Sequence, residues 1–145
     1  MARRPRPRGH PHAARPRLEL VPVEVLRPHE SLDAKLLAEV RDAIARDGVM
    51  RDPILVERSH HVILNGHHRY AALRELGCRR VPAYVIDYFD SRIEVGLWPG
   101  AVVDRVTKRE VIDRGVRGDL FPPKTTRHVV RFRLKEIAVP LSELR

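Results

Sequence analysis

Cysteine is nearly absent from this chain, and long apolar runs are absent altogether. Cys78 is the only cysteine, so no intrachain disulfide can form. No apolar stretch approaches the roughly 20 residues that cross a bilayer, and the N-terminus lacks the apolar segment of a secretion signal. We recognise no internal repeats. These absences argue against a disulfide scaffold and a membrane-spanning protein, and we expect a soluble cytoplasmic one.

Acidic residues are missing from the first 17 positions, so most of the net positive charge comes from this segment. The chain has a formal charge of +9, but residues 1–17 contain six arginines and no acid, so the remaining residues carry only +3. Residues 1–17 are also rich in Pro, Gly and His and show no apolar periodicity, which predicts a disordered arm. The arm could contact nucleic acid weakly and without sequence specificity, or simply be solvated. Residues 18–145 have an enzyme-like charge balance and suffice for one domain with a core.

Apolar periodicity predicts a compact, mixed α/β domain with short strands and about three helices. Apolar side chains at helical spacing follow Asp33, and Gly48 is expected to end that helix. A second helix follows Gly66, and the capping-box spacing of Thr107 and Glu110 predicts a third, through about Gly115. Strands are expected at 18–23, 53–56, 62–64, 81–86, 93–97 and 129–133. Residues 119–128 are expected to be a loop because two prolines interrupt them, and a short polar tail closes the chain.

The segment Val62–Arg69 predicts an anion site. An apolar strand ends at Gly66, and a helix starts directly after it. The free N–H groups and the positive dipole end of such a helix attract phosphate, and His67, His68 and Arg69 would add side-chain donors. A solvated helix start is the alternative for so short a pattern. A metal site is less favoured, because neighbouring histidines rarely converge on one ion.

Three further candidates lie elsewhere in the chain. Glu30 lies between a strand and a helix, where catalytic side chains often occur, although it could simply be an acid favoured near a helix start. Lys124–His128 concentrates polar and basic side chains, and its alternative is a charged surface loop. Trp98 follows a strand end, and on the residues alone a core or rim aromatic is the favoured interpretation.

Taken in order, these segments resemble the ParB/sulfiredoxin-like superfamily. The resemblance covers residues 18–145 and rests on the following stretches: 21–30, Gly48, 52–56, 63–69 and 76–77. Within the superfamily the chain is most similar to the free L-serine kinases, whose archaeal members use ADP and whose siderophore-pathway members use ATP. The stretches that favour this subgroup are 97–99, 107–115 and 120–128.

The resemblance implies phosphoryl transfer from ADP or ATP, with Mg²⁺, to the hydroxyl of free serine. Glu30 would be the catalytic carboxylate that accepts the hydroxyl proton. The implied phosphate-binding residues are Gly66, His67, His68 and Arg69, and the implied amino-acid pocket consists of Trp98, Lys124, Thr126, Arg127 and His128. A carboxylate that faces a basic phosphate site suits phosphoryl transfer, which depends on positioning and on neutralising charge.

Asn65 departs from the family pattern. Family members usually have Asp before Gly-His-His-Arg, whereas Asn65 keeps an acceptor oxygen but no charge. We count it with Glu30 as a catalytic position. The departure leaves a second hypothesis open, a non-catalytic, nucleotide-responsive DNA-binding or regulatory protein that uses the basic arm. We favour the kinase, because no helix-turn-helix is recognisable and the charge excess lies almost wholly in the arm.

Overall fold

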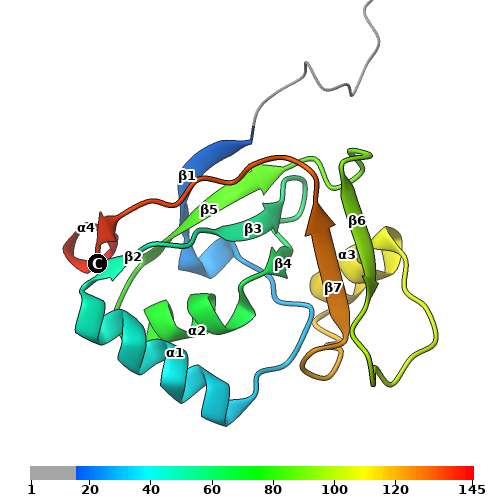
Figure 1. Ribbon diagram of the computed structural model, residues 1–145, viewed down its shortest axis with the longest axis horizontal. Coiled ribbons are helices and arrows are strands. Elements are labelled where there is room, and N and C mark those ends of the chain that lie inside the picture. The colour runs from blue at the N-terminus through cyan, green and yellow to red at the C-terminus, as the bar shows by residue number, and fades with distance from the viewer. Residues whose placement is uncertain (1–15) are drawn as a thin grey trace, which may run out of the picture.

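A four-stranded mixed sheet lies at the centre of the computed structural model, which describes residues 16–145 (Figure 1). Its strand order is β1-β5-β3-β4, with β1 at Arg17–Pro22, β3 at Ile54–Glu57, β4 at Ile63–Asn65 and β5 at Arg80–Ile86. Only β3 and β5 pair in parallel; the other two pairs are antiparallel. This confirms the mixed α/β class. Most of the predicted arm, residues 1–15, lies outside the described residues, and β1 already begins at Arg17.

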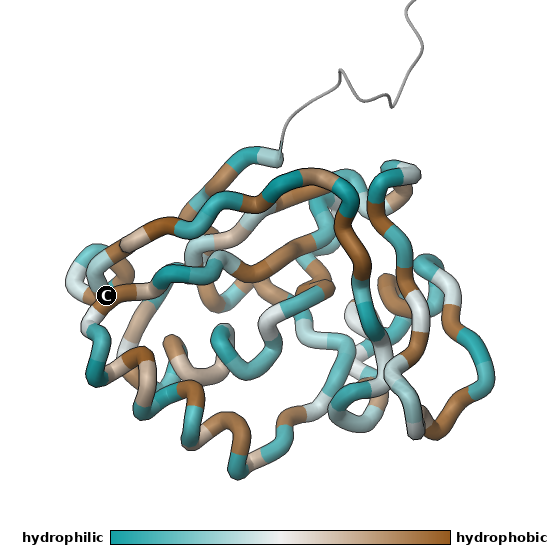
Figure 2. The backbone as a smooth tube through the Cα atoms, in the orientation of Figure 1, coloured by the Kyte–Doolittle hydropathy of each residue, from teal (hydrophilic) through white to brown (hydrophobic). Residues whose placement is uncertain are grey.

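The central strands are buried on both faces, so their side chains alternate between two cores. Ile54 and Val56 of β3 belong to one apolar cluster, whereas Leu55 between them belongs to the other. The same alternation separates Val85 from Tyr84 in β5. Period-2 alternation is what a pleated strand imposes on its side chains. Figure 2 shows the apolar stretches along these central strands.

Helices α1 (Ala34–Asp47) and α2 (His67–Glu75) pack against each other beside one face of the sheet (Figure 1). Asp33 caps α1 by accepting hydrogen bonds from the N–H groups of Lys35 and Leu36, and Gly48 ends it in the left-handed conformation. Both ends of this helix confirm the prediction. Two members of its apolar stripe, Leu37 and Ile44, pack on the core.

The second layer consists of the antiparallel pair β6 (Ile93–Leu97) and β7 (Thr126–Val130) with helix α3 (Lys108–Arg117). Thr107 and Glu110 form the predicted capping box. The predicted end at Gly115 was wrong, because Gly115 is buried within the helix against Val62 and α3 runs on to Gly118. The predicted strand at 129–133 was also wrong in extent, since β7 begins at Thr126, directly after the proline-containing loop.

The C-terminal residues are structured, which corrects the expected polar tail. Strand β8 (Val139–Pro140) pairs with β2 (Val49–Met50), and the short helix α4 (Leu141–Leu144) follows it. Leu141 and Leu144 are buried in the main core. A further single turn of 3-10 helix covers Val23–Val25. Among residues 16–145, no helix has the length and apolar character needed to cross a membrane.

Candidate active site

Residues 27–31 form an extended segment that places Glu30 between two distant parts of the chain. On one side Arg27 donates its N–H to the carbonyl of His61, and Ile63 donates back to Arg27. On the other side Phe121 donates its N–H to the carbonyl of His29, at 2.8 Å, and Ser31 donates to Phe121, also at 2.8 Å. The segment therefore behaves as an extra strand, and backbone bonds rather than side chains fix the position of Glu30.

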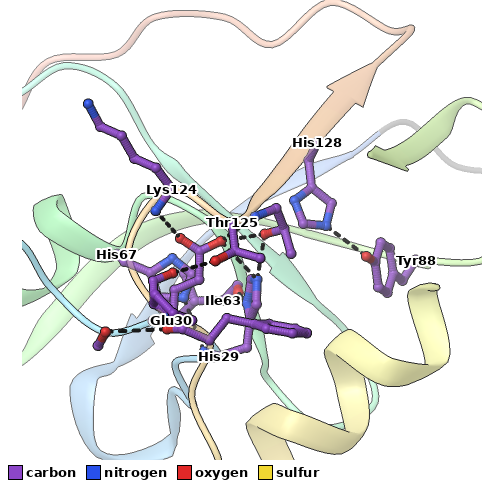
Figure 3. A network of polar contacts seen from close by, with 12 residues as sticks. His29, Glu30, Ile63, His67, Tyr88, Lys124, Thr125 and His128 are labelled. Atoms are coloured by element: carbon purple, nitrogen blue, oxygen red, sulfur yellow. Dashed lines mark hydrogen bonds and ion pairs between the residues drawn. The ribbon is translucent and has the colours of Figure 1, made fainter. Parts of the chain in front are cut away.

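The Glu30 carboxylate is buried and held by three donors. Its Oε1 accepts the backbone N–H of Lys124 at 3.1 Å. Its Oε2 accepts the backbone N–H of Thr126 at 2.8 Å and the Thr126 hydroxyl at 2.6 Å. Hydrogen bonds to a charged acceptor are among the stronger ones in proteins. The orientation of the carboxylate is thus fixed by donors of the protein itself (Figure 3).

Gly66 connects β4 to α2 in a way that only glycine allows. Its φ is 105°, and a Cβ at this position would lie 2.8 Å from the Cβ of Ile54 and 2.9 Å from Nη2 of Arg69. No side chain caps α2, and its first turn contains no acidic residue. The N–H groups that precede the first internal bond, from Tyr70 to the carbonyl of Gly66, are therefore available to an anion.

The two histidines after Gly66 are held as neutral rings. Nε2 of His67 accepts the backbone N–H of His29 at 3.1 Å, and Nε2 of His68 accepts that of Asp33 at 3.0 Å. An accepting Nε2 leaves the proton on Nδ1. Burial lowers the pKa of His67 well below its usual value, with a further contribution from the neighbouring His29. Burial also lowers the pKa of His68, although Asp33 opposes the shift. Each ring can therefore donate one hydrogen bond.

Two cations border the same site in different ways. Arg69 donates to the carbonyl oxygens of Asp52 at 3.0 Å and Pro53 at 3.3 Å, which ties α2 to the loop before β3. Burial lowers the pKa of Arg69, and Asp52 opposes that shift. Lys124 adopts a left-handed backbone conformation with φ of 58°, and Figure 3 shows its side chain extending away from the Glu30 carboxylate.

A cavity of about 540 Å³ brings most of the predicted site residues together. Those that line it are Glu30, Asn65, Gly66, His67, His68, Arg69, Trp98, Lys124 and Thr126. A second hollow of about 300 Å³ shares Val40, Asp52 and Arg69 with it. The catalytic, phosphate and substrate roles of these residues stay predictions, but their convergence from four separate stretches of the chain is a property of the fold.

Two predicted substrate residues do not line the cavity. Arg127 lies over the ring of Trp98, with its guanidinium carbon 4.9 Å from the ring centroid. His128 is on β7, not in a loop as predicted, and its Nε2 lies 2.7 Å from the Tyr88 hydroxyl. Burial lowers the pKa of His128 to about 3. Both residues therefore support neighbouring side chains in this structure.

Sequence reasoning missed several residues that build the site. His29 is fully buried beneath Glu30 and contacts Thr126 and Ile63. Leu36, Val40 and Leu64 supply the apolar part of the cavity lining. Both Leu36 and Val40 belong to the apolar side chains at helical spacing after Asp33, a pattern that predicts a helix but no site. The pattern Pro-His-Glu drew attention to this segment, but the partners of His29 are 34 and 97 positions away in the chain.

The described residues include no group of three or more His, Cys, Asp or Glu side chains that could hold a metal ion. The Mg²⁺ ion that the resemblance implies commonly binds through only one or two carboxylates together with the phosphates of a substrate. Such an ion would need oxygen ligands from a bound phosphate.

Known proteins with related sequences include several serine kinases. The chain is 35% identical over 104 residues to an ATP-dependent L-serine kinase of Staphylothermus marinus, covering 68% of this chain and 41% of that protein. It is 31% identical over 106 residues to the ADP-dependent L-serine kinase SerK of Thermococcus kodakarensis, covering 64% and 44%. A ParB-like protein of Sulfolobus acidocaldarius is 41% identical over 81 residues, covering 56% and 40%. The chain thus spans about two fifths of the length of these relatives.

Solved structures share the fold at low sequence identity. A free serine kinase in complex with AMP superposes with a TM-score of 0.79 at 21% identity, covering 88% of this chain and 93% of that one. C-terminally truncated SbnI from Staphylococcus aureus gives a TM-score of 0.78 at 18% identity, covering 88% and 89%. The model of the ParB N-terminal domain matches residues 12–97. Because this match spans more than half of the sequence, the chain belongs to the ParB N-terminal domain family.

Proposed function

We propose that this chain is a nucleotide-dependent kinase that phosphorylates the hydroxyl of free L-serine. The observation that carries the proposal is the meeting of the buried Glu30 carboxylate and the uncapped N-terminus of α2 in one cavity. A fixed carboxylate beside an anion site is the arrangement that phosphoryl transfer to an alcohol needs. The sequence similarity to proteins named L-serine kinases identifies serine as the candidate alcohol.

In this mechanism the helix start binds the phosphates and Glu30 takes the proton. The N–H groups at the start of α2 and the Nδ1–H groups of His67 and His68 would donate to the phosphate oxygens. As the serine oxygen bonds to the terminal phosphorus, the bond between that phosphorus and the leaving phosphate oxygen breaks. The hydroxyl proton passes to the Glu30 carboxylate. Mg²⁺ bound to the nucleotide would neutralise part of the phosphate charge.

Lys124 and Trp98 are the candidates for binding the amino acid. Both line the cavity, and both lie beyond residue 97, where the family match ends. A free amino acid carries a carboxylate, and Lys124, which lines the cavity, supplies a cation on a side chain that extends away from Glu30 (Figure 3). The assay below compares ADP with ATP and so identifies the phosphoryl donor.

Replacing Glu30 by Gln tests the proposal, because Gln keeps the size and removes the base. We expect turnover to fall by roughly two to four decades while nucleotide affinity changes little. The assay is phosphoserine formation, followed by mass spectrometry, with ATP and ADP in parallel.

Glu57→Gln is the matched control. Glu57 is the other buried glutamate among the described residues, and it accepts hydrogen bonds from Ser59 and His60 away from the cavity. Its loss should reduce stability but not turnover. Near-wild-type turnover of the Glu30 variant, or no phosphoserine from wild-type protein with either nucleotide, would contradict the proposal.

A further inference from the structure

Behind Glu30 lies a continuous chain of short polar contacts that ends on a fully buried histidine. The Thr126 hydroxyl lies 2.6 Å from Oε2 of Glu30 and 2.7 Å from Nε2 of His29. On the far side of the ring, Nδ1 of His29 lies 2.6 Å from the carbonyl oxygen of Ile63. Figure 3 shows Glu30 and His29 of the 27–31 segment beside Ile63 of β4, and Thr126 is the first residue of β7.

The three contacts of this network require three protons, one for each hydrogen bond. The Ile63 carbonyl can only accept, so Nδ1 of His29 carries a proton. The two contacts of the Thr126 hydroxyl, one to Glu30 and one to His29, require one proton each. The hydroxyl supplies only one of them. With Glu30 ionised and His29 neutral, the network is therefore one proton short, and one short contact places two lone pairs against each other.

One added proton satisfies every contact in two equivalent ways. If it resides on Nε2 of His29, the ring donates to Thr126, which donates to the Glu30 carboxylate 3.7 Å from that nitrogen. If it resides on Glu30, the carboxyl donates to Thr126, which donates to a neutral His29. The two states differ only by the shift of two protons along existing hydrogen bonds.

We propose that Glu30, Thr126 and His29 form a proton relay in which the proton of the acceptor hydroxyl passes from Glu30 through Oγ1 of Thr126 to Nε2 of His29. This inference rests on the proposed kinase function. Thr126 and His29 act through Glu30 and are positioning residues. When the phosphorylated product leaves, the proton returns along the same path and is released from Glu30 to solvent, so the network is restored.

The surroundings of His29 keep it neutral before the transfer. Burial lowers its pKa, while Glu30 and the Ile63 carbonyl oppose that shift. The other groups that face the ring are His67 from α2, His128 from β7 and the apolar ring of Phe121, at centroid distances of 4.7, 5.9 and 6.4 Å. Both of these histidines have lowered pKa values themselves. Glu30 is thus the one acidic residue among the groups that face His29 in the described structure.

Thr126→Val tests the relay, because Val keeps the β-branched shape and the backbone N–H donor to Glu30 but lacks the hydroxyl. We expect kcat to fall roughly tenfold or more, with less than about threefold change in KM for serine or nucleotide. The acid limb of the kcat–pH profile should move to lower pH, because Glu30 then holds the proton alone. Thr126→Ser restores the hydroxyl and should recover kcat and the position of that limb.

His29→Asn supplies a second variant. Its amide can still donate toward the Ile63 carbonyl, but it provides no base, so kcat and the acid limb should change as in Thr126→Val. A fall in kcat that Thr126→Ser does not recover, or one with no movement of the acid limb in either variant, would assign the three residues a structural role only and overturn the relay.

Nitrogen NMR of full-length protein labelled with ¹⁵N-histidine provides a readout that does not require turnover. The His29 signals are assigned by their loss in His29→Asn. At pH 8 we expect Nδ1 protonated and Nε2 unprotonated; a ring protonated on Nε2 alone could not accept a proton and would overturn the relay. Wild-type protein that makes no phosphoserine would refute the kinase and the relay together, whereas an active wild type with an equally active Thr126→Val would refute the relay alone.

Discussion

Gly66 shows how tightly single residues are constrained at this site. Gly66→Ala would combine a left-handed backbone with a clash against Ile54, whereas Gly77→Ala shares the positive φ, 81°, but meets no atom within 4 Å. We expect Gly66→Ala to cost about 1–3 kcal/mol of unfolding free energy beyond the Gly77→Ala value, because overpacking adds to the strain. Urea denaturation of both variants measures the difference. Equal losses would show that backbone strain alone makes glycine necessary at position 66.

Individual residues differ in how well the sequence predicted their placement. Gly66 and the histidines after it were identified because a strand end, a glycine and a helix start are local signals. His29 was not singled out, because its environment consists of Ile63, His67 and Thr126, which are far away in sequence. Arg127 and His128 were grouped with Lys124 because the proline-containing stretch looked irregular. In the structure they alternate along β7, and neither lines the cavity.

At the level of elements, two helix caps with similar chemistry make different connections. Asp33 caps α1 and its backbone N–H also donates to His68 at the start of α2, whereas Thr107 caps α3 on the other layer. Asp33→Ala and Thr107→Ala should each reduce the unfolding free energy by about 1 kcal/mol. Only Asp33→Ala should also weaken nucleotide binding, because a frayed start of α1 would loosen the backbone N–H of residue 33 that holds the ring of His68.

Thermal or urea unfolding measures the two stability changes, and calorimetric titration with nucleotide measures the affinity. An equal affinity loss in the two cap variants would indicate that general destabilisation, not the contact with His68, affects the site. An unchanged affinity in Asp33→Ala would remove the start of α1 from the site altogether.

The predicted boundaries of elements were wrong where tertiary packing competes with local sequence signals. Gly115 has the residue type of a helix end, yet it lies inside α3, because any side chain there would collide with Val62. The C-terminal residues looked polar, yet they form β8 and α4. Leu141 and Leu144 are buried in the core, and β8 pairs with β2. By contrast, α1 and the Thr107 capping box were predicted correctly, since their signals lie within a few residues of each other.

At the scale of the whole molecule, the site combines the family's domain with the segment that follows it. The ParB N-terminal domain match ends at residue 97 and includes Glu30 and the start of α2. The donors that hold the Glu30 carboxylate, Lys124 and Thr126, come from beyond that boundary. The part of this chain within the family match therefore contains the proposed anion site and the Glu30 carboxylate, and the pairing of β6 with β7 brings in the groups that orient this carboxylate.

Buried neutral histidines give the whole molecule a pH-dependent stability. Burial lowers the pKa of His67 well below 6.5 and that of His128 to about 3. Below about pH 6.5 the unfolded chain gains protons on these rings that the folded chain does not, so the unfolding free energy falls as the pH is lowered. Well below pH 6.5, each ring should contribute a slope of up to about 1.4 kcal/mol per pH unit.

Urea unfolding between pH 8 and pH 5 tests this expectation. Below pH 5 the protonation of carboxylates dominates the change in unfolding free energy. Wild-type stability should be nearly flat above pH 7 and decline below pH 6.5. In His128→Gln the amide can still accept a hydrogen bond from the Tyr88 hydroxyl, but it does not titrate. The variant should have a lower unfolding free energy than wild type at pH 8, and its unfolding free energy should fall less on acidification. The stability difference between the two proteins should therefore narrow by about 1.7 kcal/mol between pH 6.5 and pH 5. Parallel curves over that range would mean that His128 takes up its proton in the folded state.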